Sequence, residues 1–388
     1  MSIVSSEVKK ALIESLIRPE IKALNSYHVP DSSGLLKLDA MENPNPWPGG
    51  LTQEWLDTIK QVEANRYPDP AGMKVKAGLR EMMSLDTIEA KYSCALDILL
   101  GNGSDEIIQM IALAVANSER PIMAPEPSFV MYGMIAKFVG MPYVGIDLDT
   151  EFQLDTQAFL KAIALHNPAV IFLALPNNPT GNLFAIDDVR IIIEASKGLV
   201  VIDEAYIAFT DSDLLSLAAE YANVVVMRTL SKVGLAGLRL GFLVGHSAWL
   251  TEFDKVRLPY NINVLTQASV EFALEHYAVF EQQTRQLQVE RKALFDRLSK
   301  IQGVSPVESE ANFILVRCDT VSAKLVFSGM KARGVLIKCL DGAHPLLANC
   351  LRLTVGSAEE NEAMLVALSF VLSSIKSAAS SSSIEPLT

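Results

Sequence analysis

Arg228-Thr-Leu-Ser-Lys-Val-Gly-Leu-Ala-Gly-Leu-Arg-Leu-Gly241 is the stretch from which the rest of the chain can be understood. Within it, Lys232 stands between an apolar run, Val224-Val-Val-Met227, and a turn rich in glycine and alanine. A second apolar run, Leu240-Gly-Phe-Leu-Val-Gly245, follows the turn, and both runs are typical of buried strands. We therefore expect Lys232 at the inner edge of a sheet, where loss of water lowers the pKa of an amine.

A lysine that stays partly neutral is a nucleophile. Its obvious use is a Schiff base with a carbonyl group, above all that of pyridoxal phosphate. The phosphate of that cofactor needs nearby donors, which Ser231 and Arg239 can supply. The alternative is an ordinary loop lysine beside a salt-bridging arginine.

Length and composition point to a globular enzyme. The chain has 388 residues, which is more than one hydrophobic core usually supports, so two domains are expected. Half of the residues are hydrophobic and a fifth are charged, as in globular enzymes. The net charge of −12 provides no general basic field, and no run of lysine and arginine makes a local basic patch. Nucleic acid is therefore not an expected partner.

The N-terminal residues 1–24 have the spacing of a short amphipathic helix and lack the continuous apolar core of a signal peptide. No later segment is apolar for long enough to span a bilayer, so no membrane partner is expected. The cysteines are widely spaced, without a Cys-x-x-Cys pair, so we expect no metal site and no disulfide framework. A cytoplasmic location fits these features. The cysteines are Cys94, Cys318, Cys339 and Cys350.

From residue 97 onward, strand patterns alternate with helix patterns. This alternation predicts an α/β fold, with an open and mostly parallel sheet covered by helices on both faces. In such sheets ligands bind beyond the carboxyl ends of the strands. The expected strands are 97–100, 122–124, 143–148, 170–175 and 199–202, and the expected helices are 128–139, 156–165 and 186–195.

A long helical pattern over 265–298 leads into a predicted smaller α+β domain. Its strands are expected at 313–316, 335–337 and 351–355, and its helices at 321–332 and 359–375. We thus predict an N-terminal arm (1–38), a large domain (39–270), a small C-terminal domain (271–376) and a disordered serine-rich tail (377–388).

Three short motifs are candidates for the chemistry. Gly101-Asn-Gly-Ser-Asp-Glu106 opens a helix, so the N–H groups of Gly103, Ser104 and Asp105 can bind a phosphate, although a simple N-cap explains them equally well. Asn178 follows a buried strand on a turn, and it can donate to a phenolic oxygen or serve only the turn.

The third motif is Val200-Val-Ile-Asp-Glu-Ala-Tyr206. Asp203 ends a wholly apolar strand, where an unpaired carboxylate is costly, so it needs a positive partner such as a protonated pyridine nitrogen. Tyr206 lies three residues further on and can reach the phenolate edge of the same ring.

Asn178, Asp203, Tyr206, Lys232 and Arg239 occur in the order and approximate spacing of the fold-type I pyridoxal-phosphate enzymes, the aspartate aminotransferase superfamily. The chain resembles that superfamily over nearly its whole length. More narrowly, five motifs are similar to those of the histidinol-phosphate aminotransferase family. They are Leu38-Asp-Ala-Met-Glu-Asn-Pro44, Arg66-Tyr-Pro-Asp69, Gly101-Asn-Gly-Ser-Asp-Glu106, Arg228-Thr-Leu-Ser-Lys232 and Leu351-Arg-Leu-Thr-Val-Gly356.

The resemblance implies how the cofactor is held. Lys232 would bind it covalently and, once freed, move the proton of the substrate, while Asp203 keeps the pyridine nitrogen protonated. Asn178 and Tyr206 would hold the ring oxygen, and Tyr132 would stack on the ring. The phosphate would be held by Gly103, Ser104, Asp105, Ser231 and Arg239, with Tyr67 reaching across from a second subunit of a homodimer.

The resemblance also implies a substrate pocket. Arg352 would bind the carboxylate of glutamate and the phosphate of histidinol phosphate, and Tyr27 and Asn43 would line the pocket. The chain departs from the family pattern at Lys338, where many members have arginine, because a lysine offers a point charge in place of a bidentate fork. The loop from Lys232 to Arg239 is also one residue shorter than in many relatives.

The implied reaction converts L-histidinol phosphate and 2-oxoglutarate to imidazole acetol phosphate and L-glutamate, in histidine biosynthesis. Two alternatives share the fold: an aromatic amino-acid aminotransferase and a decarboxylase of a phosphorylated amino acid. A pyridoxal-phosphate-binding regulator is a third alternative, but it would need an added DNA-binding segment, and the sequence contains none that we can identify.

Overall fold

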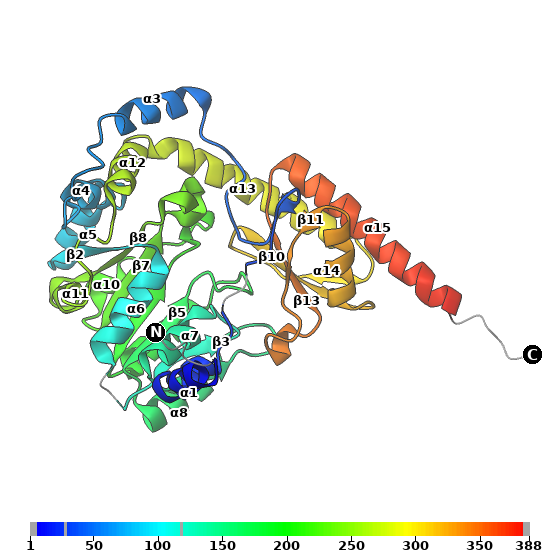
Figure 1. Cartoon of the computed structure of the whole chain (residues 1–388), viewed down its shortest axis with the longest axis horizontal. Helices are drawn as coiled ribbons and strands as arrows, with labels where there is room; N and C mark the ends of the chain where they lie inside the picture. The colour runs from blue at the N-terminus through cyan, green and yellow to red at the C-terminus, as the bar shows by residue number, and fades with distance from the viewer. Residues whose placement is uncertain (1–5, 27–28, 117–118, 383–388) are drawn as a thin grey trace, which may run out of the picture.

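The computed structural model describes residues 6–26, 29–116 and 119–382, which form a large and a small domain side by side (Figure 1). At the N-terminus, α1 (Ser6–Leu16) and α2 (Pro19–Lys22) replace the single helix that the pattern predicts. The break comes before Pro19 because proline has no N–H to continue a helix but is favourable at a helix start. Arg18, between them, donates to the carbonyl oxygen of Phe138 in the large domain.

The large domain contains, among the described residues, a seven-stranded sheet of order β2-β8-β7-β6-β5-β3-β4. Strands β3 to β7 run parallel, whereas β8 is antiparallel to both of its neighbours. The predicted mostly parallel α/β sheet is therefore confirmed. The strands are β2 (Leu96–Gly101), β3 (Ile122–Glu126), β4 (Tyr143–Asp147), β5 (Val170–Ala174), β6 (Leu199–Asp203), β7 (Val224–Thr229) and β8 (Gly241–His246).

Helices cover both faces of this sheet (Figure 1). Successive strand residues point to opposite faces, so Val200 and Ile202 pack with one hydrophobic cluster while Leu199 and Val201 pack with the other. One face is covered by α6 (Ser104–Val115), α7 (Met131–Val139) and α11 (Ser247–Asp254). The other is covered by α4 (Met73–Met82), α5 (Leu85–Tyr92), α8 (Thr156–His166), α9 (Ile186–Ala195), α10 (Leu217–Glu220) and α12 (Val264–Glu275).

Short elements connect these layers. Helix α3 (Gly49–Ile59) packs on α12. The turn that bears Lys232 begins with η2 (Ser231–Leu235) and continues into η3 (Ala236–Leu238), directly after β7. The remaining short helix of the large domain is η1 (Ile207–Phe209), which follows β6.

The small domain has, within the described part of the chain, an antiparallel sheet of order β12-β13-β10-β9. A separate parallel pair joins β1 (Leu36–Lys37) of the N-terminal arm to β11 (Val335–Leu336). The other elements are β9 (Val304–Pro306), β10 (Phe313–Cys318), β12 (Lys338–Cys339), β13 (Cys350–Thr354), α13 (Tyr277–Leu298), α14 (Ala323–Ala332), η4 (Pro345–Leu347) and α15 (Ala358–Ser382). The predicted α+β composition is present.

The predicted single helix over 265–298 is two helices, α12 and α13, which meet where the backbone of His276 leaves the helical region. Phe280 of α13 packs in the core of the large domain, whereas Leu294 and Leu298 pack in the core of the small domain. The predicted boundary at residue 270 falls inside α12. The chain passes from one domain to the other along α13 instead.

The C-terminal tail also differs from its prediction. Helix α15 continues through residues 377–382, which the serine-rich composition predicts to be disordered, and residues 383–388 lie outside the described part of the chain. Serine side chains near this end bond back to the backbone of their own helix: Ser373 Oγ donates to the Ser369 carbonyl, and Ser374 Oγ to that of Phe370. Each of these hydroxyls is thus satisfied inside the helix by the carbonyl one turn earlier.

No helix of the described residues is both long and apolar enough to cross a membrane. All four cysteines are free thiols, and Cys318 and Cys350 are buried. Burial raises the pKa of Cys318 to about 12, so this thiol stays protonated and unreactive.

Candidate active site

The carboxyl ends of β5, β6 and β7 meet at one edge of the large sheet, and a cavity opens there. Most of the side chains predicted to bind the cofactor line it, from segments far apart in sequence. Those that line the cavity are Ser104, Asp105, Asn178, Asp203, Tyr206, Ser231, Lys232 and Arg239. The parallel topology thus gathers the predicted residues as expected for an open α/β sheet.

Lys232 is placed by the turn after β7, and its side chain is half-buried at the cavity. Its Nζ donates to the carbonyl oxygen of Ala40 at 3.4 Å and lies 5.7 Å from the ring centroid of Tyr206. Burial, followed by the positive charge of Arg352, lowers the pKa of Lys232 to about 8. A substantial fraction of this amine is therefore neutral near physiological pH, as nucleophilic attack requires.

Asp203 is the last residue of β6 and is 4% exposed. Its Oδ2 accepts from the hydroxyl of Tyr132 at 2.6 Å, and its Oδ1 accepts from the N–H of Ala205 at 3.1 Å. Burial raises the pKa of Asp203 to about 6, although both donors oppose the shift. Because neither donor is cationic, a positively charged ligand group beside this carboxylate would stabilise its ionised form.

Asn178, Tyr206 and Arg352 form a chain of hydrogen bonds that crosses from the large to the small domain. Asn178 Nδ2 donates to the Tyr206 hydroxyl at 3.2 Å, and Arg352 Nη1 donates to Asn178 Oδ1 at 2.5 Å. Arg352 Nη2 also donates to the carbonyl oxygen of Asp39 at 3.0 Å. Burial raises the pKa of Tyr206, so this hydroxyl stays protonated as a donor.

A cradle for an anion lies at the N-terminus of α6. Gly103 has φ +85°, and a Cβ at this position would lie 2.5 Å from Arg239 Nη2, so only glycine leaves room for the guanidinium. Arg239 is half exposed and lies 3.6 Å from Asp105 Oδ2. On the other side, the Ser231 N–H donates to Thr229 Oγ1 at 3.1 Å, and the Thr229 hydroxyl donates to Ser231 Oγ at 2.9 Å. Free N–H groups of the first helical turn and an arginine together suit a phosphate.

Tyr132 does not have the position predicted for it. Its ring is fully buried and stacks on Phe172 at 4.6 Å, beneath the sheet edge, and its hydroxyl is used by Asp203. Phe129 lines the cavity instead, and its ring meets that of Tyr132 edge to face at 5.6 Å. Phe129 therefore lies where a ring-stacking residue is needed, and Tyr132 orients Asp203.

Tyr27, predicted to line the substrate pocket, lies outside the described residues. Two further predicted residues, Asn43 and Tyr67, do not line the cavity. Asn43 Nδ2 donates to the carbonyl oxygen of Val233 and to Gln283 Oε1, at 3.0 and 2.9 Å, so Asn43 fastens the proline loop to the turn of Lys232. Tyr67 is 80% exposed and stacks on Tyr260 at 4.4 Å.

Lys338 and Arg352 are directly opposite each other in the antiparallel pair of β12 and β13. Opposite residues of such a pair share one face of the sheet, so the two cationic side chains project to the same side. Arg352 is 8% exposed and Lys338 is half-buried. The pair therefore concentrates positive charge beside Asn178.

Some residues of the site carry no signal in the sequence. Met41 lines the cavity with a buried side chain and φ +53°, and Thr229 lines it beside Ser231. Thr229 is part of the Arg228-Thr-Leu-Ser-Lys232 motif, which could have marked it. The carbonyl oxygens of Asp39 and Ala40 belong to the main chain, so no residue type reveals them.

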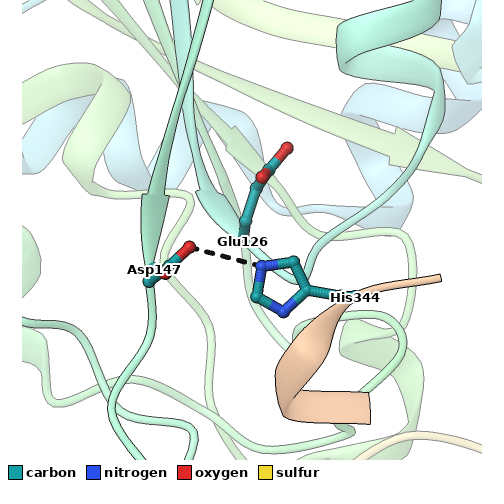
Figure 2. Close-up of side chains that lie close together, drawn as sticks. All are labelled: Glu126, Asp147 and His344. Carbon is teal, nitrogen blue, oxygen red and sulfur yellow. Dashed lines mark hydrogen bonds and ion pairs between the residues drawn. The ribbon is translucent and has the colours of Figure 1, made fainter. Parts of the chain in front are cut away.

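Glu126, Asp147 and His344 bring potential metal-ligand atoms within 4.8 Å of one another (Figure 2). His344 Nδ1 accepts from the N–H of Leu346 at 3.2 Å, which places the proton of a neutral ring on Nε2. That nitrogen faces Asp147 Oδ1 at 3.3 Å. A metal needs an unprotonated nitrogen, so this arrangement favours a polar contact between the domains over a metal centre.

The residues present fit pyridoxal phosphate. A buried carboxylate, Asp203, suits a protonated pyridine nitrogen; the Gly103 cradle with Arg239 suits a phosphate; and the partly neutral Lys232 suits a carbonyl carbon. The three lie around one cavity, with Asn178 and Tyr206 between them.

Residues 34–368 match the protein family described as aminotransferase class I and II. The chain is 49% identical over 359 residues to histidinol-phosphate aminotransferase 2 of Nitrosococcus oceani, which covers 92% of this chain and 98% of that protein. It is 48% identical over 359 residues to histidinol-phosphate aminotransferase of Chromobacterium violaceum, with the same coverage. Among solved structures, histidinol-phosphate aminotransferase of Sinorhizobium meliloti in complex with pyridoxal-5'-phosphate has a TM-score of 0.81 and 22% identity, covering 93% of this chain and 98% of that one.

Proposed function

The chain belongs to the class I and II aminotransferases and, among them, to the histidinol-phosphate aminotransferases, and from this membership we propose its reaction. It transfers the amino group of L-histidinol phosphate to 2-oxoglutarate, giving imidazole acetol phosphate and L-glutamate, as a step of histidine biosynthesis. The observation that carries the proposal is the half-buried, partly neutral Lys232, which lines one cavity with Asp203 and Arg239.

The cofactor is pyridoxal 5'-phosphate, which supplies an aldehyde carbon that takes up the amino group and a protonated ring that withdraws electrons from it. Asp203 holds the proton on the ring nitrogen, because its buried carboxylate is stabilised by a neighbouring cation. Asn178 and Tyr206 orient the ring oxygen, and Phe129 covers a face of the ring. The main-chain N–H groups of Ser104 and Asp105, with Ser231 and Arg239, bind the phosphate. The N–H of Gly103, also predicted for this role, donates to the carbonyl oxygen of Gly101 at 2.8 Å, so Gly103 contributes the turn.

Lys232 moves the proton of the reaction. Its Nζ would hold the bound cofactor covalently. As a free neutral amine, it would accept the proton of the substrate α-carbon and return it during the amino transfer. An amine of pKa about 8 suits both transfers, because it accepts and returns a proton near neutral pH.

Arg352 and Lys338 recognise the anionic end of the substrate. Arg352 presents a planar fork that binds a carboxylate or a phosphate, and Lys338 adds a second positive charge on the same face. The phosphate of histidinol phosphate carries nearly two negative charges and can use both cations. Glutamate places a single carboxylate there and needs Arg352 most.

The proposal includes a homodimer in which Tyr67 donates to the cofactor phosphate of the neighbouring subunit. Its support is an exposed apolar surface formed by two adjoining segments, because soluble monomers rarely expose such patches without use. Tyr67 stacks on Tyr260, and Arg257 Nη1 donates to the carbonyl oxygen of Pro70, which joins the segments. The exposed side chains are Tyr67, Met73, Leu258, Tyr260 and Leu265.

A cytoplasmic location is also part of the proposal. Its support is the state of the cysteines, which are all free thiols, including the buried Cys318 and Cys350. Free, buried thiols of this kind are usual in a reducing compartment.

The test is a substrate comparison with the purified holoenzyme. 2-Oxoglutarate is paired in turn with histidinol phosphate, phenylalanine and threonine phosphate, and glutamate and carbon dioxide are measured. We expect glutamate to form fastest with histidinol phosphate and no carbon dioxide to be released. Faster reaction with phenylalanine would indicate an aromatic aminotransferase, and carbon dioxide from threonine phosphate would indicate a decarboxylase.

A further inference from the structure

Residues 39–41 (Asp39-Ala40-Met41), here called the strap, lie between the small domain and the active site. The strap contacts both Arg352 and Lys232. The strap follows β1, which pairs with β11 of the small domain, and it runs past the cavity to the proline loop. The carbonyl oxygen of Asp39 accepts from Arg352 Nη2 at 3.0 Å. The next carbonyl oxygen, that of Ala40, accepts from Lys232 Nζ at 3.4 Å. Consecutive peptide groups thus contact the substrate-binding arginine and the reactive lysine.

Two buried polar side chains of the small domain hold the strap. Asn312 Nδ2 donates to the carbonyl oxygen of Met41 at 3.0 Å. Thr354 Oγ1 accepts from the N–H of Met41 at 3.1 Å, while the N–H of Thr354 donates to the carbonyl oxygen of Leu38 at 3.1 Å. Asn312 is 1% exposed and Thr354 is 2% exposed.

The backbone of the strap needs this support. Met41 has φ +53°, a left-handed conformation that costs energy for a residue with a side chain. The N–H of Met41 donates to Thr354, and its carbonyl oxygen accepts from Asn312, so neither group is left to bond elsewhere. The Met41 N–H lies in the same planar peptide unit as the Ala40 carbonyl, so its bond to Thr354 fixes the direction of that carbonyl.

The direction of that carbonyl matters for the chemistry of an amine. A neutral amine has two N–H donors and one lone pair, and a carbonyl oxygen can only accept. When Lys232 donates one N–H to Ala40, its lone pair must point elsewhere, and the cavity lies on the other side. If the Ala40 carbonyl changed direction, the amine could rotate and its lone pair would no longer point to the cavity.

We propose that Asn312 and Thr354 are positioning residues that hold the strap, so that the Ala40 carbonyl orients the amine of Lys232 and the Asp39 carbonyl orients the guanidinium of Arg352. The strap thereby couples the proton-transfer group to the substrate-binding group through two adjoining peptide units. The inference rests on the proposed function for its use, but its first test is independent of activity.

The charged and titratable groups around Lys232 come from several elements. They are Arg352 on β13, Glu42 after the strap, Arg239 after η3, Asp105 on α6, and the Tyr206 hydroxyl before η1. Burial outweighs them all in setting the low pKa of the lysine. The strap covers the amine, so loosening it admits water and raises that pKa towards its ordinary value.

The first experiment measures the reactivity of Lys232 in the full-length protein without cofactor. Acetic anhydride labels neutral amines, and mass spectrometry of the Lys232 peptide gives the labelling rate as a function of pH. In Thr354→Val and Asn312→Asp, which keep side-chain size, we expect the labelling pKa to rise by about one unit from about 8. At pH 8 the neutral fraction, and the rate with it, then falls about fivefold.

Two controls separate positioning from a general loss of packing. Thr354→Ser keeps the hydroxyl and should label like wild type. Thr284→Val removes another buried hydroxyl, which bonds only within α13 to the Glu281 carbonyl at 2.9 Å, and should also label like wild type. Thermal melting of each variant verifies the fold. If Thr354→Val and Asn312→Asp label with the pKa of Thr284→Val, or if Thr354→Ser shifts as far as Thr354→Val, the proposal is wrong.

The second experiment uses the holoenzyme and histidinol phosphate. Because the strap touches both cations, Thr354→Val should lower kcat about tenfold and raise KM as well, whereas Thr354→Ser should restore both. An unchanged kcat in Thr354→Val would overturn the coupling. A wild-type enzyme that is inactive on histidinol phosphate but shows the labelling shift would refute the proposed reaction and leave the positioning of Lys232 intact.

Discussion

The large domain and the small domain each contribute two key charged groups, and the two pairs differ. Asp203 ends β6 and Lys232 follows β7, and loss of water is the main cause of the pKa shift of each. Arg352 and Lys338 lie opposite each other in the pair of β12 and β13. Each pair has one buried and one half-buried member, so the pairs differ in what they are arranged for: the first has shifted pKa values, and the second places two cations on one face.

This difference indicates a division of labour. Groups that must change protonation state need a dry setting that brings their pKa near neutrality. Groups that bind an anion need only stay charged and aimed, so they tolerate water and substitution better. We therefore expect changes in the large-domain pair to affect turnover and changes in the small-domain pair to affect substrate choice.

The largest effect is expected for Lys232→Ala. Without the amine, nothing holds the cofactor covalently or moves the α-proton, so turnover should fall about a thousandfold or more. The wild-type protein should be yellow, with an absorption band that borohydride traps, and the variant should lose that trapping. Lys255→Ala, at an exposed lysine of a surface ion pair, is the control and should be unaffected. Equal activity in both variants would end the cofactor assignment.

Asp203→Asn should come next in size. An amide cannot hold the ring nitrogen protonated by charge, so kcat should drop about a hundredfold or more while the fold remains. Steady-state rates and the affinity for added cofactor measure this. A near-normal kcat would reduce Asp203 to a structural strand end.

The same residue predicts a pH dependence of stability in the cofactor-free protein. The pKa of Asp203 is raised from 3.8 to about 6, so the folded state binds a proton more tightly than the unfolded state. Its contribution is favourable below about pH 4 and is lost as the pH rises to about 6, a change of up to about 3 kcal/mol. Asp203→Asn should lack this loss. The unfolding free energy of the variant, minus that of wild type, should therefore rise between pH 4 and pH 7, as measured by urea unfolding. The same difference at both pH values would contradict this.

Lys338→Ala should separate the two substrates of the small-domain pair. Loss of one charged hydrogen bond should weaken the use of histidinol phosphate by about 1.5 to 3 kcal/mol, seen as a higher KM, and affect glutamate less. Lys338→Arg should be tolerated. If both half-reactions change equally, or neither changes, Lys338 is an exposed strand-end lysine and another residue selects the phosphate.

Tyr67→Phe should have the smallest effect. It removes one hydrogen bond to the cofactor phosphate across the proposed dimer, worth about 1.5 kcal/mol in cofactor affinity. Titration of the cofactor-free protein measures it, and sedimentation should show a dimer for both proteins. A fully active monomer would remove the shared site from the proposal.

The sequence predicts this architecture well where burial follows a simple period. Short, β-branched apolar runs such as Val224-Val-Val-Met227 are typical of strands buried on both faces, and the ends of these strands place Asp203 and Lys232. The sequence does not reveal that β8 is antiparallel to its neighbours, because an apolar strand has the same pattern in either direction. The sequence also gives no sign of the helix break at His276, because the helical spacing of apolar residues continues on both sides of it.

The site is predictable where a residue type has one chemical use and less so where orientation decides. Phe129 lies in the loop just before α7 and Tyr132 in its first turn, three residues apart, so both are plausible neighbours of a ring. In the structure the Tyr132 hydroxyl donates to Asp203, and Phe129 lines the cavity. Spacing could not distinguish them, because it does not say which way the helix faces. The strap escapes prediction for another reason: its contacts are carbonyl oxygens, which every residue possesses.

Helix α13 has a mechanical consequence. Its 22 residues make a helix of about 33 Å. The first turn packs in the core of the large domain, and the last turns pack in the core of the small domain. Such a helix has no flexible joint along its length, so the domains cannot swing freely about it. Any closing motion must be a bend shared over many turns or a small sliding at its packed ends. The enzyme should therefore admit its substrates by shifts of a few ångströms, and glycine placed in the middle of α13 should loosen the domains without touching either pair of charges.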